Sequence, residues 1–94
     1  MDAVLERAQR IRLLVLDVDG VLTDGRLHIS ASGEEFKVFH VRDGSGLVAI
    51  QRAGITVAII SGRDSPAVIH RARELGISHV RQGVADKGAE LDRL

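Results

Sequence analysis

The 94-residue chain has no cysteine, no tryptophan and no tyrosine, and its only aromatic residues are Phe36 and Phe39. Without cysteine it cannot form a disulfide, a thiolate zinc site or a cysteine nucleophile. Two aromatic residues do not make the stacking surface that single-stranded nucleic acid requires. Aliphatic side chains must therefore build the core, for which the hydrophobic content of 45% is adequate.

An excess of charge is also missing, because 13 basic residues balance 13 acidic ones. This balance argues against a nucleic-acid or membrane surface as the partner. No apolar run reaches the roughly 20 residues that a membrane-spanning helix needs. Residues 1–7 also lack the apolar region of a signal peptide. We therefore expect a cytoplasmic protein that binds neither nucleic acid nor membrane.

Two carboxylates directly follow an apolar run. Residues 13–16 are Leu-Leu-Val-Leu, and Asp17, Val18, Asp19 and Gly20 come next. A buried parallel strand would carry both aspartates to its carboxyl end, where open α/β sheets bind ligands. Strand geometry sends the two carboxylates to one side and Val18 to the other. Because the carboxylates repel, the pair predicts a shared proton or a hard cation such as Mg²⁺, which would also attract phosphate. Acids that merely form a turn are the plainer interpretation, which the apolar run disfavours.

Apolar segments and helical patterns alternate along the remaining chain, and a hairpin follows the first strand. The expected elements are a short helix at 2–10, strands at 12–18, 27–30, 35–41, 56–60 and 78–80, and helices at 45–53, from Pro66 to about Leu75, and from Lys87 onward. Ser65 would cap the helix that begins at Pro66. The core side of that helix would be Val68, Ile69, Ala72 and Leu75. The expected fold class is α/β, a three-layer Rossmann-like parallel sheet with a β-hairpin insertion after its first strand.

Right-handed crossovers between parallel strands would bring their carboxyl ends to one edge of the sheet. The strand at 56–60 leads into Ser61, Gly62 and Arg63, and the loop after the third strand leads to Lys87. Carboxylates, a hydroxyl, backbone amides and an ammonium at one edge suit phosphoryl transfer. An aspartate can attack phosphorus, and a second carboxyl can move the proton. Alone, Ser61 would be a strand-end hydroxyl, and Arg63 and Lys87 would be solvated side chains.

Several segments together resemble a known phosphatase family. Residues 17–24 (Asp-Val-Asp-Gly-Val-Leu-Thr-Asp), residues 59–63 (Ile-Ile-Ser-Gly-Arg) and Lys87 resemble the first three motifs of the haloacid dehalogenase superfamily. Residues 33–44 and 75–83 resemble its capless branch, which contains the 3-deoxy-D-manno-octulosonate (KDO) 8-phosphate phosphatases. The resemblance extends from Arg12 to Lys87.

This resemblance implies Mg²⁺-dependent hydrolysis of a sugar-acid phosphate, KDO 8-phosphate above all, in lipopolysaccharide biosynthesis. It also implies a homotetramer that forms through the hairpin at 26–41, with neighbouring subunits covering the active site. Phosphates of related nine-carbon sugar acids fit nearly as well.

Roles follow motif by motif. Asp17 would be the nucleophile and a metal ligand, and Asp19 would be the general acid/base, with its carbonyl on the metal. The resemblance further implies phosphate binding by Ser61, Gly62 and Lys87, and substrate binding by Arg63, Arg42 and Asp43. Arg42 and Asp43 could instead only shape the turn after the hairpin.

The chain departs from the family in one respect. A fourth motif, Gly-Asp-Asp or Gly-Asp-x-x-x-Asp, supplies further metal ligands in these phosphatases, and Glu90 and Asp92 are poor substitutes for it. We therefore expect residues 1–94 to form one incomplete domain, truncated at its C-terminus, whose first strand is an exposed edge. An inactive fragment, or an oligomerisation module like the phosphatase-like domain of CMP-sialic acid synthetases, is the alternative. A signalling receiver domain fits less well, because Ser61 stands where a later strand would need its aspartate.

Overall fold

The computed structural model describes residues 10–94, so the helix expected at 2–10 lies outside the described residues apart from Arg10. The elements in chain order are β1 (Leu13–Leu16), β2 (His28–Ile29), β3 (Glu35–Phe36), α2 (Val41–Arg52), β4 (Thr56–Ile60), α3 (Pro66–Glu74), β5 (His79–Arg81) and α4 (Lys87–Asp92). Within this range no helix has the length and apolar character needed to cross a membrane.

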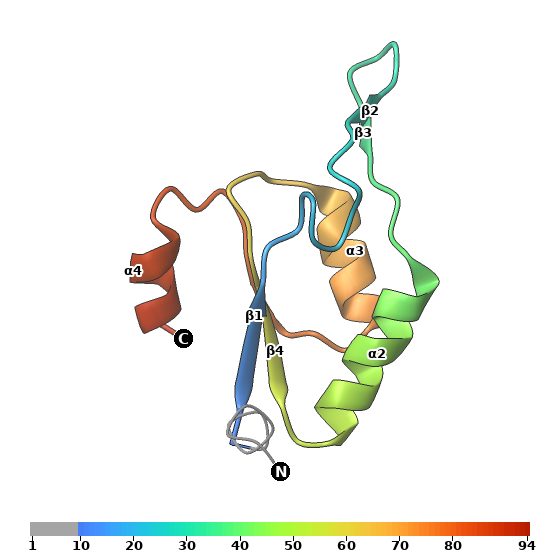
Figure 1. Cartoon of the computed structure of the whole chain (residues 1–94). Coiled ribbons are helices and arrows are strands. Elements are labelled where there is room, and N and C mark those ends of the chain that lie inside the picture. Colours follow the sequence, from blue (N-terminus) through green and yellow to red (C-terminus); the bar gives the residue numbers. More distant parts are fainter. Residues whose placement is uncertain (1–9) are drawn as a thin grey trace.

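Three parallel strands form the central sheet, in the order β1-β4-β5 (Figure 1). Leu16 pairs with Ile59, and Ile59 pairs in turn with Val80. β4 lies in the middle because its run from Val57 to Ile60 is buried throughout, as a strand covered on both faces must be. The expected parallel α/β sheet is confirmed.

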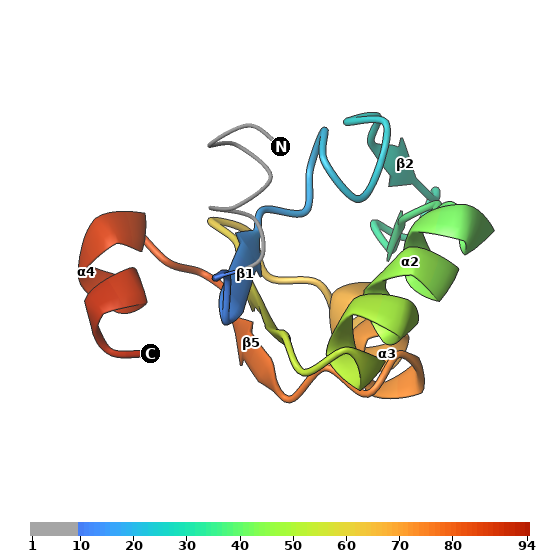
Figure 2. The same ribbon diagram turned by 60° about the horizontal axis from the view of Figure 1, so that its bottom comes forward.

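The sheet lies between two layers of helices (Figure 2). Helices α2 and α3 pack on one face, and α4 lies on the other. The core between the sheet and its helices is aliphatic, and its buried residues are Val18, Leu47, Val57, Ile59, Val68, Ala72 and Ile77. These side chains hold the strand ends that carry the candidate site.

β1 ends at Leu16, two residues earlier than the expected 12–18 strand. The backbone turns here because the carbonyl of Val18 accepts hydrogen bonds from the amides of Val21, Leu22 and Thr23. Gly20 makes the turn with φ of +80°, a left-handed conformation that favours glycine. Val18 is fully buried, so its neighbours Asp17 and Asp19 are turned away from the core.

The segment between β1 and α2 differs from the expected long strands at 27–30 and 35–41. β2 and β3 are an antiparallel pair of two residues each, and they extend away from the central sheet (Figure 1). Helix α2 starts at Val41 rather than at residue 45, because the His40 side chain caps it by accepting the amide hydrogen of Arg42. Residues 37–40 therefore link β3 to the helix instead of continuing the strand.

Helix α3 begins at Pro66 as expected, but the Ser65 side chain makes no capping hydrogen bond. Gln82 instead holds the backbone just before the helix, since its side chain accepts from the Ser65 amide and donates to the Ser65 carbonyl. Val68 and Ala72 are buried as expected. The prediction for Ile69 was wrong: 46% of it is exposed, because it lines a cavity between α3 and β5.

Candidate active site

Asp17 lies directly after β1 with each carboxylate oxygen held by a different group. Its Oδ1 accepts the amide hydrogen of Val18 at 2.8 Å. Its Oδ2 lies 3.2 Å from Nζ of Lys87, the first residue of α4. Lys87 thus lies beside the end of the first strand, as expected. Both side chains remain accessible, 38% exposed for Asp17 and 49% for Lys87.

Asp19 faces two other cations. Nζ of Lys37 lies 2.7 Å from its Oδ1, and Nε of Arg63 lies 3.9 Å from its Oδ2. Glu35 pairs with the same two cations: its Oε1 lies 2.8 Å from Nζ of Lys37, and its Oε2 lies 2.7 Å from Nη2 of Arg63. A four-membered network of alternating charge therefore connects the turn after β1, the base of the hairpin and the loop after β4.

The charged groups of this network shift one another's pKa values. Hydrogen bonds from Lys37 and Arg63 hold the pKa of Glu35 below its ordinary value. Burial works against the ammonium of Lys37, but the carboxylates of Asp19 and Glu35 outweigh it and raise the pKa of Lys37. The hydrogen bond to Glu35 likewise raises the pKa of Arg63. All three groups are therefore charged at neutral pH.

Ser61 and Gly62 follow β4 at the same edge of the sheet. The Ser61 amide donates to the carbonyl of Arg81, and the Ser61 carbonyl accepts from the amide of Val84. The Ser61 hydroxyl oxygen accepts from the amide of Arg63 at 3.3 Å, which leaves its own hydrogen available to a ligand. Ser61 is 2% exposed, so it lies at the base of the site.

Arg42 and Asp43 lie apart from these residues, in the first turn of α2. Within residues 10–94 no ion pair or side-chain hydrogen bond joins either of them to the sheet-edge residues. Asp43 borders a cavity of about 350 Å³ between α2 and the turn after β1. Their expected contact with substrate stays a prediction.

The oxygen donors at the end of β1 fit Mg²⁺ in type. Magnesium prefers hard oxygen ligands and is commonly held by one or two carboxylates together with water and substrate phosphate. Asp17 supplies an accessible carboxylate and Asp19 a neighbouring carbonyl at the same turn. No cluster of three histidine, aspartate or glutamate side chains capable of holding a metal is present among residues 10–94.

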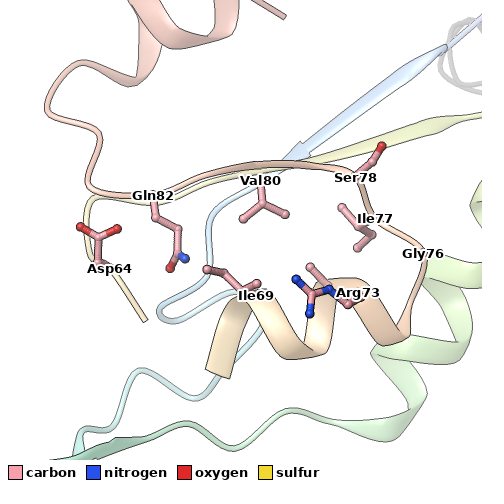
Figure 3. Close-up of a pocket in the computed structure, with 9 residues that line it drawn as sticks. Asp64, Ile69, Arg73, Gly76, Ile77, Ser78, Val80 and Gln82 are labelled. Carbon is pink, nitrogen blue, oxygen red and sulfur yellow. The ribbon is translucent and has the colours of Figure 1, made fainter. Parts of the chain in front are cut away.

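A cavity of about 660 Å³ lies elsewhere, between α3 and β5 (Figure 3). Ile69, Ile77 and Val80 line it, with Asp64 and Gln82 toward one end and Arg73 toward the other. None of the site residues named above borders it. The candidate site lies instead at the carboxyl edge of the sheet, where Asp17 and Lys87 are both accessible.

Sequence reasoning missed Lys37 and Glu35. Both were placed in a strand of the hairpin, where alternation alone does not separate an exposed charge from one that turns toward the sheet. The signal that could have identified Lys37 is that it is the one charged residue in the otherwise apolar segment 36–39. A lysine in an apolar segment needs carboxylate partners, and Asp19 was an available one.

Comparison with known proteins relates this geometry to phosphatases. The chain is 49% identical over 86 residues to the KDO 8-phosphate phosphatase of Yersinia pestis, and the aligned segment covers 92% of this chain. The chain is homologous to the KDO 8-phosphate phosphatases. The relatives are phosphatases of the haloacid dehalogenase superfamily, as the resemblance of the motifs implied. No protein-family model matches this chain.

Solved structures agree with this relationship. The KDO 8-phosphate phosphatase of Moraxella catarrhalis, determined with magnesium ion, phosphate ion and KDO, superimposes with a TM-score of 0.94 at 46% identity. That alignment covers 99% of this chain and 53% of the other. The cobalt-bound enzyme of Haemophilus influenzae gives a TM-score of 0.86 at 46% identity, over 90% of this chain and 50% of the other.

The chain spans about half the length of the curated relatives it matches, 46% for the Yersinia pestis protein. The similarity therefore concerns only about half of each relative. The single incomplete domain expected from the sequence stays a prediction.

Proposed function

We propose that the protein hydrolyses a sugar-acid phosphate in a Mg²⁺-dependent reaction, with KDO 8-phosphate as the substrate. The observation that carries this proposal is the pairing of Asp17 with Lys87 beside Asp19 at the carboxyl edge of the sheet. The relatives named for this activity, and the one determined with magnesium, phosphate and KDO, support the choice of substrate and metal. Lipopolysaccharide biosynthesis would be the pathway.

In the first step an Asp17 oxygen attacks phosphorus, forming an aspartyl-phosphate while the bond from phosphorus to the sugar oxygen breaks. Asp19 donates a proton to that leaving oxygen. Lys87 lies beside Asp17, so it orients the nucleophile and neutralises charge on the phosphoryl oxygens. Ser61 and the Gly62 amide would hold the remaining oxygens.

In the second step a water molecule attacks the aspartyl-phosphate and Asp19 takes a proton from it. The bond between phosphorus and Asp17 breaks, which releases inorganic phosphate and restores both carboxyl groups. Asp17 and the carbonyl of Asp19 would hold Mg²⁺, which would supply Lewis-acid neutralisation of the phosphate charge.

Substrate selectivity would come from Arg63, which is 47% exposed at the edge of the site. A guanidinium recognises carboxylates well, and sugar acids carry one. Arg42 and Asp43, in the first turn of α2, remain proposed substrate contacts.

A homotetramer built through residues 26–41 is part of the proposal. The hairpin exposes apolar side chains that a partner surface would bury, namely Leu27, Ile29, Phe36 and Val38. The accessibility of Asp17 and Lys87 also favours a neighbour as the cover of the site. Replacing Ile29, which is 61% exposed, by lysine should dissociate the assembly in light scattering. A dissociation constant equal to that of the native chain would contradict the interface.

The test of the activity is phosphate release from KDO 8-phosphate by the purified chain, with and without Mg²⁺, and with Asp17→Asn as the control. A nine-carbon sugar-acid phosphate and a simple sugar phosphate complete the substrate set. Mg²⁺-dependent turnover that Asp17→Asn abolishes is the expected result. A folded chain without turnover would favour the alternative, a non-catalytic assembly module. The cytoplasmic location expected from the sequence stays a prediction.

A further inference from the structure

Lys37 is buried at the base of the hairpin between two carboxylates. Its side chain is 2% exposed, and its Nζ lies 2.7 Å from Asp19 and 2.8 Å from Glu35. Removing an ammonium from water is costly, so such a lysine persists only where carboxylates compensate it. Because it is covered, Lys37 cannot act on a substrate directly.

The two aspartates at the end of β1 are engaged differently. Asp17 meets the half-exposed Lys87, which can move toward a phosphoryl oxygen. Asp19 meets the covered Lys37 on one oxygen and faces Arg63 on the other. A carboxylate whose oxygens already face cations is a poor ligand for a further cation. Its orientation is also fixed, so that it can accept a proton from the attacking water in a defined direction.

We propose that Lys37 is a positioning residue that fixes the Asp19 carboxylate for proton transfer and keeps it from serving as a metal ligand. This inference rests on the acid/base role proposed above for Asp19. Glu35 extends the effect, because the same carboxylate binds Lys37 on one oxygen and Arg63 on the other. The hairpin thereby sets both the general base and the arginine beside it.

The absence of cysteine gives this proposal a clean kinetic test, because a cysteine introduced at position 37 is unique. Lys37→Cys, alkylated while unfolded and then refolded, can carry an aminoethyl group that restores the ammonium or a neutral carbamidomethyl group of similar size. We expect the neutral form to lose about 100-fold in kcat, as for a lost general base. KM should stay within about threefold, because Lys37 does not touch substrate.

The aminoethyl form should recover most of the lost kcat. Native-like activity in both alkylated forms would overturn the proposal. Equal loss in both forms, once folding is verified by circular dichroism, would also overturn it. Arg93→Met is the matched control, since Arg93 also pairs with a carboxylate, Glu90 at 2.9 Å, but is 73% exposed and lies outside both the site and the hairpin. It should leave kcat unchanged.

A second readout does not depend on turnover. In carbon-13 spectra Mg²⁺ should shift the carboxyl signal of Asp17 and leave that of Asp19 nearly unmoved in the native chain. In Lys37→Met both signals should shift, because Asp19 is then free to bind the ion. The same response of Asp19 to Mg²⁺ in the two proteins, whatever its size, would overturn the proposal. Failure of the activity itself would appear separately, as absent turnover in the unmodified chain.

Discussion

Replacing Lys87 by methionine should separate catalysis from stability. The side chains of Lys87 and Asp17 lie 3.2 Å apart. Two unit charges at that distance attract by about 1.3 kcal/mol in bulk water and about 5 kcal/mol at an effective dielectric constant near 20. Since the side chains are 49% and 38% exposed, the lower value applies, and the entropy of ordering two side chains reduces it further.

We therefore expect Lys87→Met to lower the free energy of unfolding by at most about 1 kcal/mol, which is at most about 4–8 °C in Tm for a domain of this size. In catalysis the same ammonium would face charge that develops in the transition state. Loss of one such group costs about 10²–10³ in kcat. The expected variant is thus nearly as stable as the native chain and almost inactive.

Arg81→Met is the matched control for Lys87→Met. Arg81 forms an ion pair with Glu90 at 3.3 Å, is 46% exposed and also connects to α4, but it is not part of the proposed site. It should show a similar small loss of stability with unchanged turnover. Both variants would be measured by thermal unfolding and by phosphate release. A Lys87→Met chain that keeps a third or more of the native kcat, or unfolds as if it had lost a core residue, would refute the reasoning.

Three further results are expected. Val18→Ala should lower the free energy of unfolding by about 2 kcal/mol in urea titrations, because Val18 is fully buried beneath the site; an effect within error would contradict this packing. Because the folded pKa of Glu35 lies below its ordinary value of 4.5, its stabilisation is present above that pH and is lost as the pH falls. The difference in Tm between the native chain and Glu35→Gln should therefore shrink between pH 6 and about pH 3, and a difference that does not vary with pH would speak against the pairing. Gly20→Ala should cost about 1 kcal/mol or more, since φ of +80° disfavours a side chain there, and an equally stable variant would show that the turn can rearrange.

Much of the sheet followed from the sequence because two of its three strands, β1 and β4, are largely apolar. The strand at Thr56–Ile60 was predicted with its observed bounds, since burial on both faces gives the apolar run from Val57 to Ile60, which ends at Ser61. The proximity of Asp17 and Lys87 followed from topology alone, because parallel strands share a carboxyl edge.

The hairpin region was predicted less well, because its structure depends on contacts distant in sequence. Residues 35–41 alternate in a way that favours a strand, yet β3 ends at Phe36. Lys37 pairs with Asp19, 18 positions away, and His40 caps the following helix. Ile69 has the spacing of a core residue but faces a cavity at the edge of a three-stranded sheet. Local pattern cannot show how far a sheet extends.

The measurement that tests the account most directly is chemical trapping of the aspartyl-phosphate on Asp17. Borohydride reduces an acyl phosphate to an alcohol, so a chain quenched during turnover of KDO 8-phosphate with Mg²⁺ should carry the reduced group. Peptide mass spectrometry should locate that group at Asp17, and it should be absent without Mg²⁺. Reduction at Asp19 or another residue, or turnover with no reduced residue, would contradict Asp17 as the nucleophile.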